Sequence, residues 1–235
     1  MTPTSDELPE GEEKSRKVRR LFDTISGRYD LVNRVMTLGM DIGWRRRAVR
    51  ELRLPGEALV VDLACGTGDL CRELVRRGYR TVGFDFSHGM LANARGSNPL
   101  VEADILRLPL ADGSVDGATC GFALRNVVSL PELFAEVARV VRPEGRIALL
   151  ETSEPDVAVL RAGHALYFRR VVPLIGGLLS SREAYSYLPR SVAYLPPAME
   201  MAGMLSEAGF REVERSQLSS GVVQLLTGTR TGGTL

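Results

Sequence analysis

The sequence predicts an α/β protein with a mostly parallel, doubly wound sheet of seven strands, helices on both faces and a helical N-terminal extension. Two observations predict this fold. Between residues 58 and 151, short apolar runs typical of buried strands alternate with short segments typical of helices, and this order indicates a parallel sheet with crossover helices. Two more strand-like segments, 213–218 and 222–227, follow near the C-terminus.

The N-terminal part lacks this alternation. Residues 1–13 are rich in Pro, Glu, Asp, Gly and Ser, and we expect them to be disordered. Residues 14–54 predict a helical extension of three helices. The first begins at Lys14, the second is residues 30–38, and the third is capped by Asp41.

Residues 55–230 are predicted to form one domain around the sheet. Its strands are 58–64, 81–86, 100–103, 115–122, 146–151, 213–218 and 222–227. Its helices are 69–77, 89–95, 131–141 and 198–208. Pro131 stands at the first position of its helix, where its missing N–H breaks no hydrogen bond. Residues 143–145 predict a turn before the fifth strand.

Length, charge and cysteines narrow the class of protein. The 235 residues are enough for a sizeable core, and a net charge of +1 gives no whole-chain argument for nucleic-acid binding. The N-terminus lacks the apolar centre of a signal peptide, and no apolar run reaches about 18 residues. Neither a C-x-x-C pair nor a metal-ligand set is formed by Cys65, Cys71 and Cys120. We therefore expect a reduced, cytoplasmic setting and no metal.

Gly66 and Gly68 follow directly after the first strand of the domain. Glycine allows the backbone to turn sharply and a ligand to approach it closely. A dinucleotide fingerprint requires a third glycine, but Cys71 occupies that position, and Asp69 would repel a diphosphate. An acidic loop fits a ligand with a cationic end and no phosphate, and S-adenosylmethionine is such a ligand.

Acidic residues lie near the carboxyl ends of the first three strands, where open sheets bind ligands. Asp85 is placed either to accept hydrogen bonds from two ribose hydroxyls or to cap the next helix, and Ser87 can serve as that cap. Asp62 predicts either a direct ligand contact or hydrogen bonds that stabilise the loop. Asp104, with Ile105, predicts either a contact with an adenine edge or a surface turn.

Several segments resemble motifs of the ubiquinone/menaquinone biosynthesis C-methyltransferases. They are residues 21–33, 44–46, 62–70, 121–127, 139–146, 185–192, 208–210 and 221–223. The most specific are the R-Y-D-x-x-N, L-R-N and Y-x-Y-L-x-x-S patterns, and the resemblance extends over about residues 18–230. It implies a Rossmann-like class I methyltransferase that uses S-adenosylmethionine to methylate a ring carbon of a prenylated quinol, most often demethylmenaquinol.

The resemblance also implies a set of cofactor contacts. Family contacts carried over to this chain are Thr67, Asp85, Asp104, Ile105 and Gly121, although the family often has serine at the last position. With the glycine loop and the residues after the second strand, the predicted cofactor site is Asp62, Ala64, Gly66, Thr67, Gly68, Asp85, Phe86, Met90, Asp104, Ile105 and Gly121.

Arg125 and Asn126 follow the fourth strand, where a substrate oxygen would lie. An arginine is too weak a base to remove a proton. We therefore expect Arg125 to stabilise a developing phenolate electrostatically, with Asn126 and Tyr29 hydrogen-bonding the ring oxygens. The alternatives are that Arg125 forms a salt bridge to the N-terminal helices and that Tyr29 only packs in the core.

Three functions follow from these observations. The first is a quinol C-methyltransferase, the second is a methyltransferase of another small aromatic or secondary metabolite, and the third is a non-catalytic S-adenosylmethionine-binding partner subunit. Ala123 and Leu226 replace a glycine and a histidine of the family near the expected acceptor, which leaves the acceptor open. The sequence has no basic stripe interleaved with aromatic residues, the pattern that would indicate nucleic-acid binding.

Two segments raise the question of membrane contact. Residues 155–197 predict a substrate-side insertion, and its apolar part, 157–180, is either a lid for a prenyl tail at a lipid surface or a core helix with a basic face. The run 44–47, Trp-Arg-Arg-Arg, is either a membrane-surface patch or a charged helix face. Peripheral contact with the inner face of the membrane and a homodimer therefore stay open.

Overall fold

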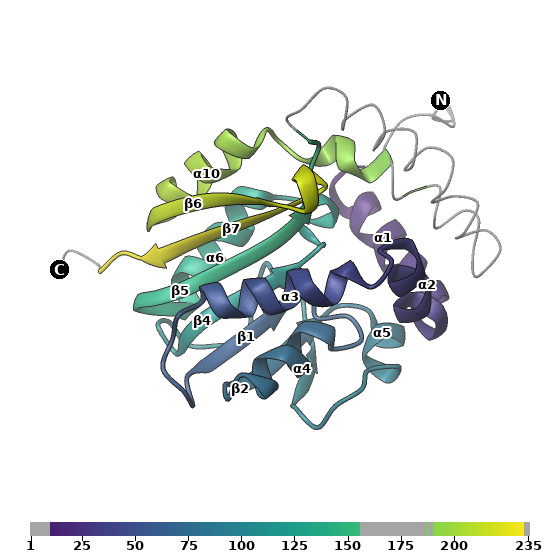
Figure 1. Ribbon diagram of the computed structural model, residues 1–235, viewed down its shortest axis with the longest axis horizontal. Coiled ribbons are helices and arrows are strands. Elements are labelled where there is room, and N and C mark those ends of the chain that lie inside the picture. Colours follow the sequence, from purple (N-terminus) through teal and green to yellow (C-terminus); the bar gives the residue numbers. More distant parts are fainter. Residues whose placement is uncertain (1–9, 156–186, 188–189, 233–235) are drawn as a thin grey trace.

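The computed structural model describes residues 10–155, 187 and 190–232. At its centre lies a seven-stranded sheet in the order β3-β2-β1-β4-β5-β7-β6 (Figure 1). The strands are β1 Leu59–Leu63, β2 Arg80–Asp85, β3 Leu100–Glu102, β4 Val115–Gly121, β5 Val141–Thr152, β6 Phe210–Leu218 and β7 Val223–Arg230. Neighbours among β1 to β5 pair in parallel, and β7 runs antiparallel to both β5 and β6. The predicted seven-stranded, mostly parallel sheet is confirmed.

The order of the strands reverses beside β1. The chain passes from β1 to β2 and β3 in one direction, whereas β4 and β5 lie on the other side of β1. In an open α/β sheet, ligands bind beyond the carboxyl ends of the strands at such a reversal. The loops that follow β1 and β4 are therefore the expected walls of a ligand site.

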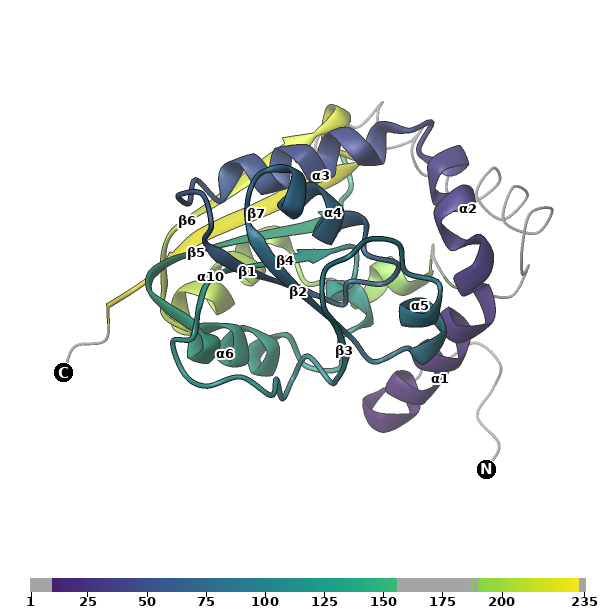
Figure 2. The same ribbon diagram turned by 90° about the horizontal axis from the view of Figure 1, so that it is seen from below.

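Helices cover both faces of the sheet (Figures 1 and 2). On one face lie α3 Met40–Glu51 and α4 Asp69–Arg76, and on the other lie α6 Leu130–Val140 and α10 Ala198–Glu207. At one end of the sheet lie α1 Gly11–Ile25, α2 Tyr29–Met36 and α5 His88–Ala92. The short 3-10 turns are η1 Ser26–Arg28, η2 Leu124–Asn126, η4 Val192–Tyr194 and η5 Ser219–Gly221.

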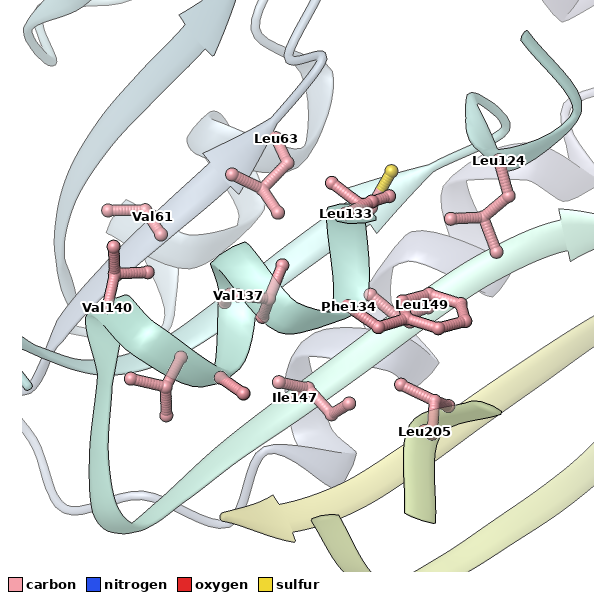
Figure 3. Close-up of a cluster of buried hydrophobic side chains, with 14 of the residues drawn as sticks. Val61, Leu63, Leu124, Leu133, Phe134, Val137, Val140, Ile147, Leu149 and Leu205 are labelled. Atoms are coloured by element: carbon pink, nitrogen blue, oxygen red, sulfur yellow. The ribbon is translucent and has the colours of Figure 1, made fainter. Parts of the chain in front are cut away.

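Alternation along β5 contributes to a core on each face. Ile147 and Leu149 pack with side chains of α6 and α10, whereas Ala148 and Leu150 pack with those of α3 and α4. Successive side chains of a strand point to opposite faces, which explains the division. Figure 3 shows the first of these cores, to which α6 contributes Phe134. Full burial of one such large apolar side chain contributes about 1.5–3 kcal/mol to stability.

The N-terminal helices depart from prediction at two points. Helix α1 begins at Gly11, so residues 11–13 are helical rather than disordered. Helix α3 begins after Gly39, whose φ of +76° ends the preceding turn, and no side chain caps it. The predicted cap Asp41 lies inside the helix instead, where its carboxylate accepts hydrogen bonds from Arg34 and Thr37. The cap prediction was therefore wrong because these tertiary partners occupy the carboxylate.

The predicted turn at 143–145 lies within β5. Val115 pairs with Val141 and Gly117 pairs with Arg146, so the extra residues of β5 form a bulge. The predictions for residues 1–9 and for the apolar segment 157–180 fall outside the described part of the chain. Within the described part, no helix is long and apolar enough to cross a membrane.

Candidate active site

A cavity lies beyond the carboxyl ends of β1, β2 and β4 and holds about 1030 Å³ of space, its open mouth included. The loops after these strands form much of its wall. The N-terminal helices contribute another part through Ser15, Val18, Phe22, Tyr29 and Arg45. The cavity therefore lies at the reversal of strand order, where a small-molecule site is expected.

Most of the predicted site residues line this cavity. They are Tyr29, Asp62, Ala64, Gly66, Thr67, Asp85, Phe86, Met90, Asp104, Ile105, Gly121 and Asn126. Gly68 and Arg125 are not part of the lining. Arg45, Asp69 and Phe122 line the cavity although the sequence did not single them out as ligand contacts.

The loop after β1 turns sharply because it contains several left-handed residues. The angle φ is +51° at Ala64, +56° at Gly66 and +83° at Gly68. A Cβ atom at Gly68 would lie 3.3 Å from the carbonyl oxygen of Arg95, so glycine there permits both the turn and this close approach. Gly68 thus shapes the loop without touching the cavity. The loop leads into the N-terminus of α4, where free N–H groups favour a negatively charged group.

Asp85 ties the end of β2 to the glycine loop. Its Oδ2 accepts a hydrogen bond from the Gly66 N–H at 2.8 Å, and its Oδ1 accepts one from the Ser87 N–H at 2.8 Å. Burial raises the pKa of this carboxyl above its ordinary value. The side chain that caps α5 is Ser87, whose Oγ accepts a hydrogen bond from Met90 N. Each carboxylate oxygen of Asp85 keeps a lone pair for a ligand hydroxyl.

Asp62 is only 1% exposed, and its carboxylate is hydrogen-bonded within the protein. Its Oδ1 accepts a hydrogen bond from Thr119 Oγ1 at 2.8 Å, and its Oδ2 accepts one from Cys71 Sγ at 3.4 Å. Burial raises the pKa of this carboxyl to about 7. The side chain therefore ties the end of β1 to β4 and to the first turn of α4, and it also lines the cavity.

Asp104 and Thr67 also make protein contacts at the cavity wall. Asp104 is exposed, and its Oδ1 accepts a hydrogen bond from Leu106 N at 2.9 Å, which forms the predicted surface turn. Thr67 is buried, and its Oγ1 donates a hydrogen bond to Asp30 Oδ1. The second contact joins the glycine loop to α2, so the cofactor loop and the N-terminal helices are held together.

Three positions that differ from the family have distinct surroundings. A Cβ at Gly121 would lie 2.8 Å from Leu70 Cδ1, so a serine there would require the leucine side chain to move. Ala123 lines the cavity, as expected for a residue near the acceptor. Leu226 does not: it is fully buried in the core formed with α6 and α10. The expectation that Leu226 borders the acceptor was therefore wrong.

Tyr29 and Asn126 lie where an acceptor ring could enter. The Tyr29 ring packs edge-on against Phe22 at 5.8 Å between centroids, and burial raises the pKa of its hydroxyl. Asn126 Oδ1 accepts a hydrogen bond from the buried Tyr187 hydroxyl at 3.4 Å. Tyr187 belongs to the Y-x-Y-L-x-x-S motif, yet its contact with Asn126 could not be read from the motif. The Tyr29 side chain therefore packs against Phe22 and also lines the cavity.

Arg125 does not line the cavity. Its guanidinium forms a salt bridge with Glu151 of β5, which is fully buried, and its backbone N–H donates to Glu151 Oε2 at 3.2 Å. The sequence offered a salt bridge from Arg125 to the N-terminal helices as an alternative, but the observed partner is Glu151 of β5. Glu151 attracts the arginine because a buried carboxylate requires a cation beside it.

The run 44–47 divides between the interior and the surface. Trp44 packs in the core under α3, and Arg45 is 8% exposed with its guanidinium 5.9 Å from the Phe122 ring centroid. Arg46 and Arg47 instead form salt bridges with Glu73 and Glu51. A single membrane patch or charged face is therefore excluded for the whole run, because Trp44 and Arg45 are buried.

Comparisons with known proteins agree with this arrangement. The sequence model described as the ubiE/COQ5 methyltransferase family matches residues 10–230. The ubiquinone/menaquinone biosynthesis C-methyltransferase UbiE of Citrifermentans bemidjiense is 37% identical over 230 residues, which are 93% of this chain and 98% of that one. The demethylmenaquinone methyltransferase of Corynebacterium kroppenstedtii is 41% identical over 222 residues, 93% of this chain and 96% of that one.

A solved structure shares the fold at much lower identity. An S-adenosylmethionine-dependent methyltransferase from Thermotoga maritima superimposes with a TM-score of 0.62 at 19% identity, over 90% of this chain and 99% of that one. At this identity the likeness concerns the fold alone. The family match extends over nearly the whole chain, including the segments that line the cavity. This chain therefore belongs to the ubiE/COQ5 methyltransferase family.

Proposed function

We propose that this protein is an S-adenosylmethionine-dependent C-methyltransferase that methylates a ring carbon of a prenylated quinol of the demethylmenaquinol type. The observation that carries the proposal is that one cavity holds both Asp85, at the end of β2, and the polar pair Tyr29 and Asn126. The names of the relatives, which refer to quinone biosynthesis, support the choice of acceptor.

The cofactor end of the cavity fits S-adenosylmethionine. Asp85 would hold the two ribose hydroxyls with the lone pairs that its bonds to Gly66 and Ser87 leave free. Ile105 and Met90 would give the adenine ring apolar contact, and Asp104 would accept a hydrogen bond from its polar edge. The sulfonium of the bound cofactor supplies the electrophilic methyl group.

The acceptor end fits an aromatic ring with two oxygens. Part of the cavity wall is apolar and is formed by Val18, Phe22 and Val127. Polar groups that can hydrogen-bond the ring oxygens come from Tyr29 and Asn126. Loss of the hydroxyl proton would make the neighbouring ring carbon nucleophilic. This carbon would gain the methyl group as the bond from that group to the cofactor sulfur breaks and the sulfur keeps the electron pair. The ring carbon would then lose its own hydrogen as a proton. Among the described residues no histidine lines the cavity. We therefore assign water at the open mouth as the acceptor of the hydroxyl proton.

Two effects then account for the rate. Holding the ring carbon in line with the methyl group turns a bimolecular encounter into a step within one complex, which can lower the barrier by about 7–11 kcal/mol. Donors aimed at the ring oxygen stabilise the charge that develops on it.

A prenylated acceptor resides in lipid, so we propose peripheral contact with the membrane. The exposed side chains of Leu31, Leu38 and Met40 on the α2–α3 hairpin support this contact.

Labelled S-adenosylmethionine tests the proposal when it is incubated with the protein and a chemically reduced demethylmenaquinone analogue. We expect one methyl group on the quinol ring carbon, identified by mass spectrometry and NMR. Transfer only to other small aromatic compounds would reassign the acceptor. Tight cofactor binding without any transfer would instead indicate a non-catalytic partner subunit.

A further inference from the structure

Arg45 is the cationic side chain of the cavity wall. Among the described residues that line the cavity, it alone carries a positive charge. Its side chain is 10% exposed, and it comes from α3, within the motif segment 44–46. The same cavity is lined by Tyr29 and Asn126, the pair proposed to hydrogen-bond the acceptor, and by Phe122, which packs beside the Arg45 guanidinium.

Contacts on three sides hold the Arg45 guanidinium in place. Its Nη1 forms an ion pair with Asp41 one turn earlier on α3, and its Nη2 lies 3.3 Å from Asp69 Oδ2 at the start of α4. Its carbon Cζ lies 5.9 Å from the centroid of the Phe122 ring. Phe122 itself has a φ of +61°, a strained value for a bulky residue. The guanidinium is therefore a fixed charge rather than a mobile one, which is the arrangement that electrostatic catalysis requires.

The surrounding charges are shared among several groups. Arg34 also contacts Asp41 and Asp69, and Arg72 also contacts Asp69. On the loop side, Asp30 is bonded to Thr67. Because Asp41 and Asp69 each have a second arginine partner, they neutralise Arg45 only in part. Asp41 is absent from the cavity wall, whereas Asp69 lines it beside Arg45.

The charge of Arg45 acts on the Tyr29 hydroxyl at the cavity wall. Arg125 and, to a smaller extent, Arg45 both act to lower the pKa of this hydroxyl, against the larger effect of burial, and Arg45 acts in the same direction on Asp62. A field that favours an anionic oxygen at Tyr29 also favours one on a ring oxygen hydrogen-bonded to Tyr29. Arg125, by contrast, is paired with buried Glu151 and is absent from the lining.

We infer that Arg45, rather than Arg125, supplies the positive charge that stabilises the developing phenolate of the acceptor. This inference rests on the proposed function, because it assumes an acceptor with an ionisable ring oxygen. The step that it assists is the loss of the hydroxyl proton to water, which leaves the electron pair on the oxygen and raises the nucleophilicity of the ring carbon. No new co-reactant is required.

A spectroscopic titration tests the inference without methyl transfer. The probe is 4-nitro-1-naphthol, whose anion absorbs visible light, bound to the protein that is saturated with S-adenosylhomocysteine. In the wild-type protein we expect the bound naphthol to ionise more readily than in water. Arg45→Gln should weaken this ionisation by on the order of tenfold, which is one pKa unit. Arg45→Lys, which keeps the charge, should retain most of the effect.

Matched variants separate a local field from a general one. Arg46→Gln removes a neighbouring arginine of the same helix whose side chain is 63% exposed, and it should leave the titration unchanged. If Arg45→Gln does not fold, the double variant Asp41→Asn with Arg45→Gln also removes the buried carboxylate that loses one of its arginine partners, and it should still show the weaker ionisation. An unchanged titration in a folded Arg45→Gln or double variant would overturn the inference.

The methyl-transfer assay distinguishes failure of this inference from failure of the proposed function. A wild-type protein that shifts the naphthol titration but does not methylate the quinol would retain the role of Arg45 and lose the proposed acceptor. A protein that methylates the quinol with an identical pH profile in wild type and Arg45→Gln would retain the proposed function and lose the role of Arg45.

Discussion

Asp85 Oδ2 accepts a hydrogen bond from the Gly66 N–H at 2.8 Å, and this bond joins the carboxyl end of β2 to the loop that follows β1. The two strands pair in parallel, with Leu63 opposite Phe84, so their ends meet at the same edge of the sheet. One side chain thereby fixes the shape of the loop and presents its remaining lone pairs to the cavity.

Asp85→Ala is expected to weaken cofactor binding sharply. At the proposed cofactor site the change would remove two hydrogen bonds to the ribose, and it removes the anchor of the Gly66 N–H. Each net hydrogen bond contributes about 0.5–1.5 kcal/mol. We therefore expect the dissociation constant of S-adenosylhomocysteine to rise by roughly ten- to a hundredfold, measured by calorimetry. Asp112→Ala, at an exposed carboxylate paired with Arg139, is the control. Equal affinity in wild type and Asp85→Ala would show that Asp85 does not hold the ribose.

Tyr187→Phe is expected to lower turnover while leaving cofactor affinity unchanged. The Tyr187 hydroxyl donates to Asn126 Oδ1, so the amide N–H₂ is left for a ring oxygen. Without this donor the amide can flip, and we expect kcat to fall by about tenfold, which corresponds to roughly 1.4 kcal/mol of barrier. Tyr79→Phe removes a hydroxyl that donates to the Leu54 carbonyl and lies outside the cavity, and it should leave kcat unchanged. A similar loss in both variants would indicate a general packing effect.

Arg125→Gln is expected to destabilise the protein more than it affects the chemistry. It leaves the fully buried Glu151 without its cation, and removal of one partner of a buried ion pair is typically destabilising by about 3–5 kcal/mol. The double variant Arg125→Gln with Glu151→Gln should recover much of this loss, as measured by urea unfolding. If Arg125→Gln retains wild-type stability and loses only turnover, Arg125 acts on the substrate after all.

Stability should fall as pH rises from about 4 to about 7 through the contribution of Asp62. Its ordinary pKa is 3.8, and burial raises it to about 7 in the folded protein. Between these two pKa values the folded state binds more protons than the unfolded state. The stabilising contribution of Asp62 is therefore fully present below the ordinary pKa and is lost as pH rises through the pKa of the folded protein. Asp62→Asn removes this dependence. Urea unfolding of both proteins across this range should show a smaller decline for the variant, and parallel declines would contradict the assignment.

Local patterns predicted the sheet and the helices, and together with the family resemblance they predicted about half of the residues that line the cavity. The apolar run before Gly66 and the position of Asp85 after the next strand are sequence features that become neighbours through parallel pairing alone. Contacts set by tertiary structure escaped prediction. Asp41 had the residue type of a cap but is held by arginines, and Arg45 stands in a run of three arginines whose burial differs only through the packing of α3. The partner of Arg125 lies 26 residues away and carries no local signal.

A crystal structure with S-adenosylhomocysteine and a naphthoquinone analogue tests the central claim most directly. We expect the ribose hydroxyls on Asp85 and the ring oxygens within hydrogen-bonding distance of Tyr29 and Asn126, with the sulfur facing the ring carbon to be methylated. A quinone bound outside this cavity, or a nucleoside bound away from Asp85, would contradict the proposed site.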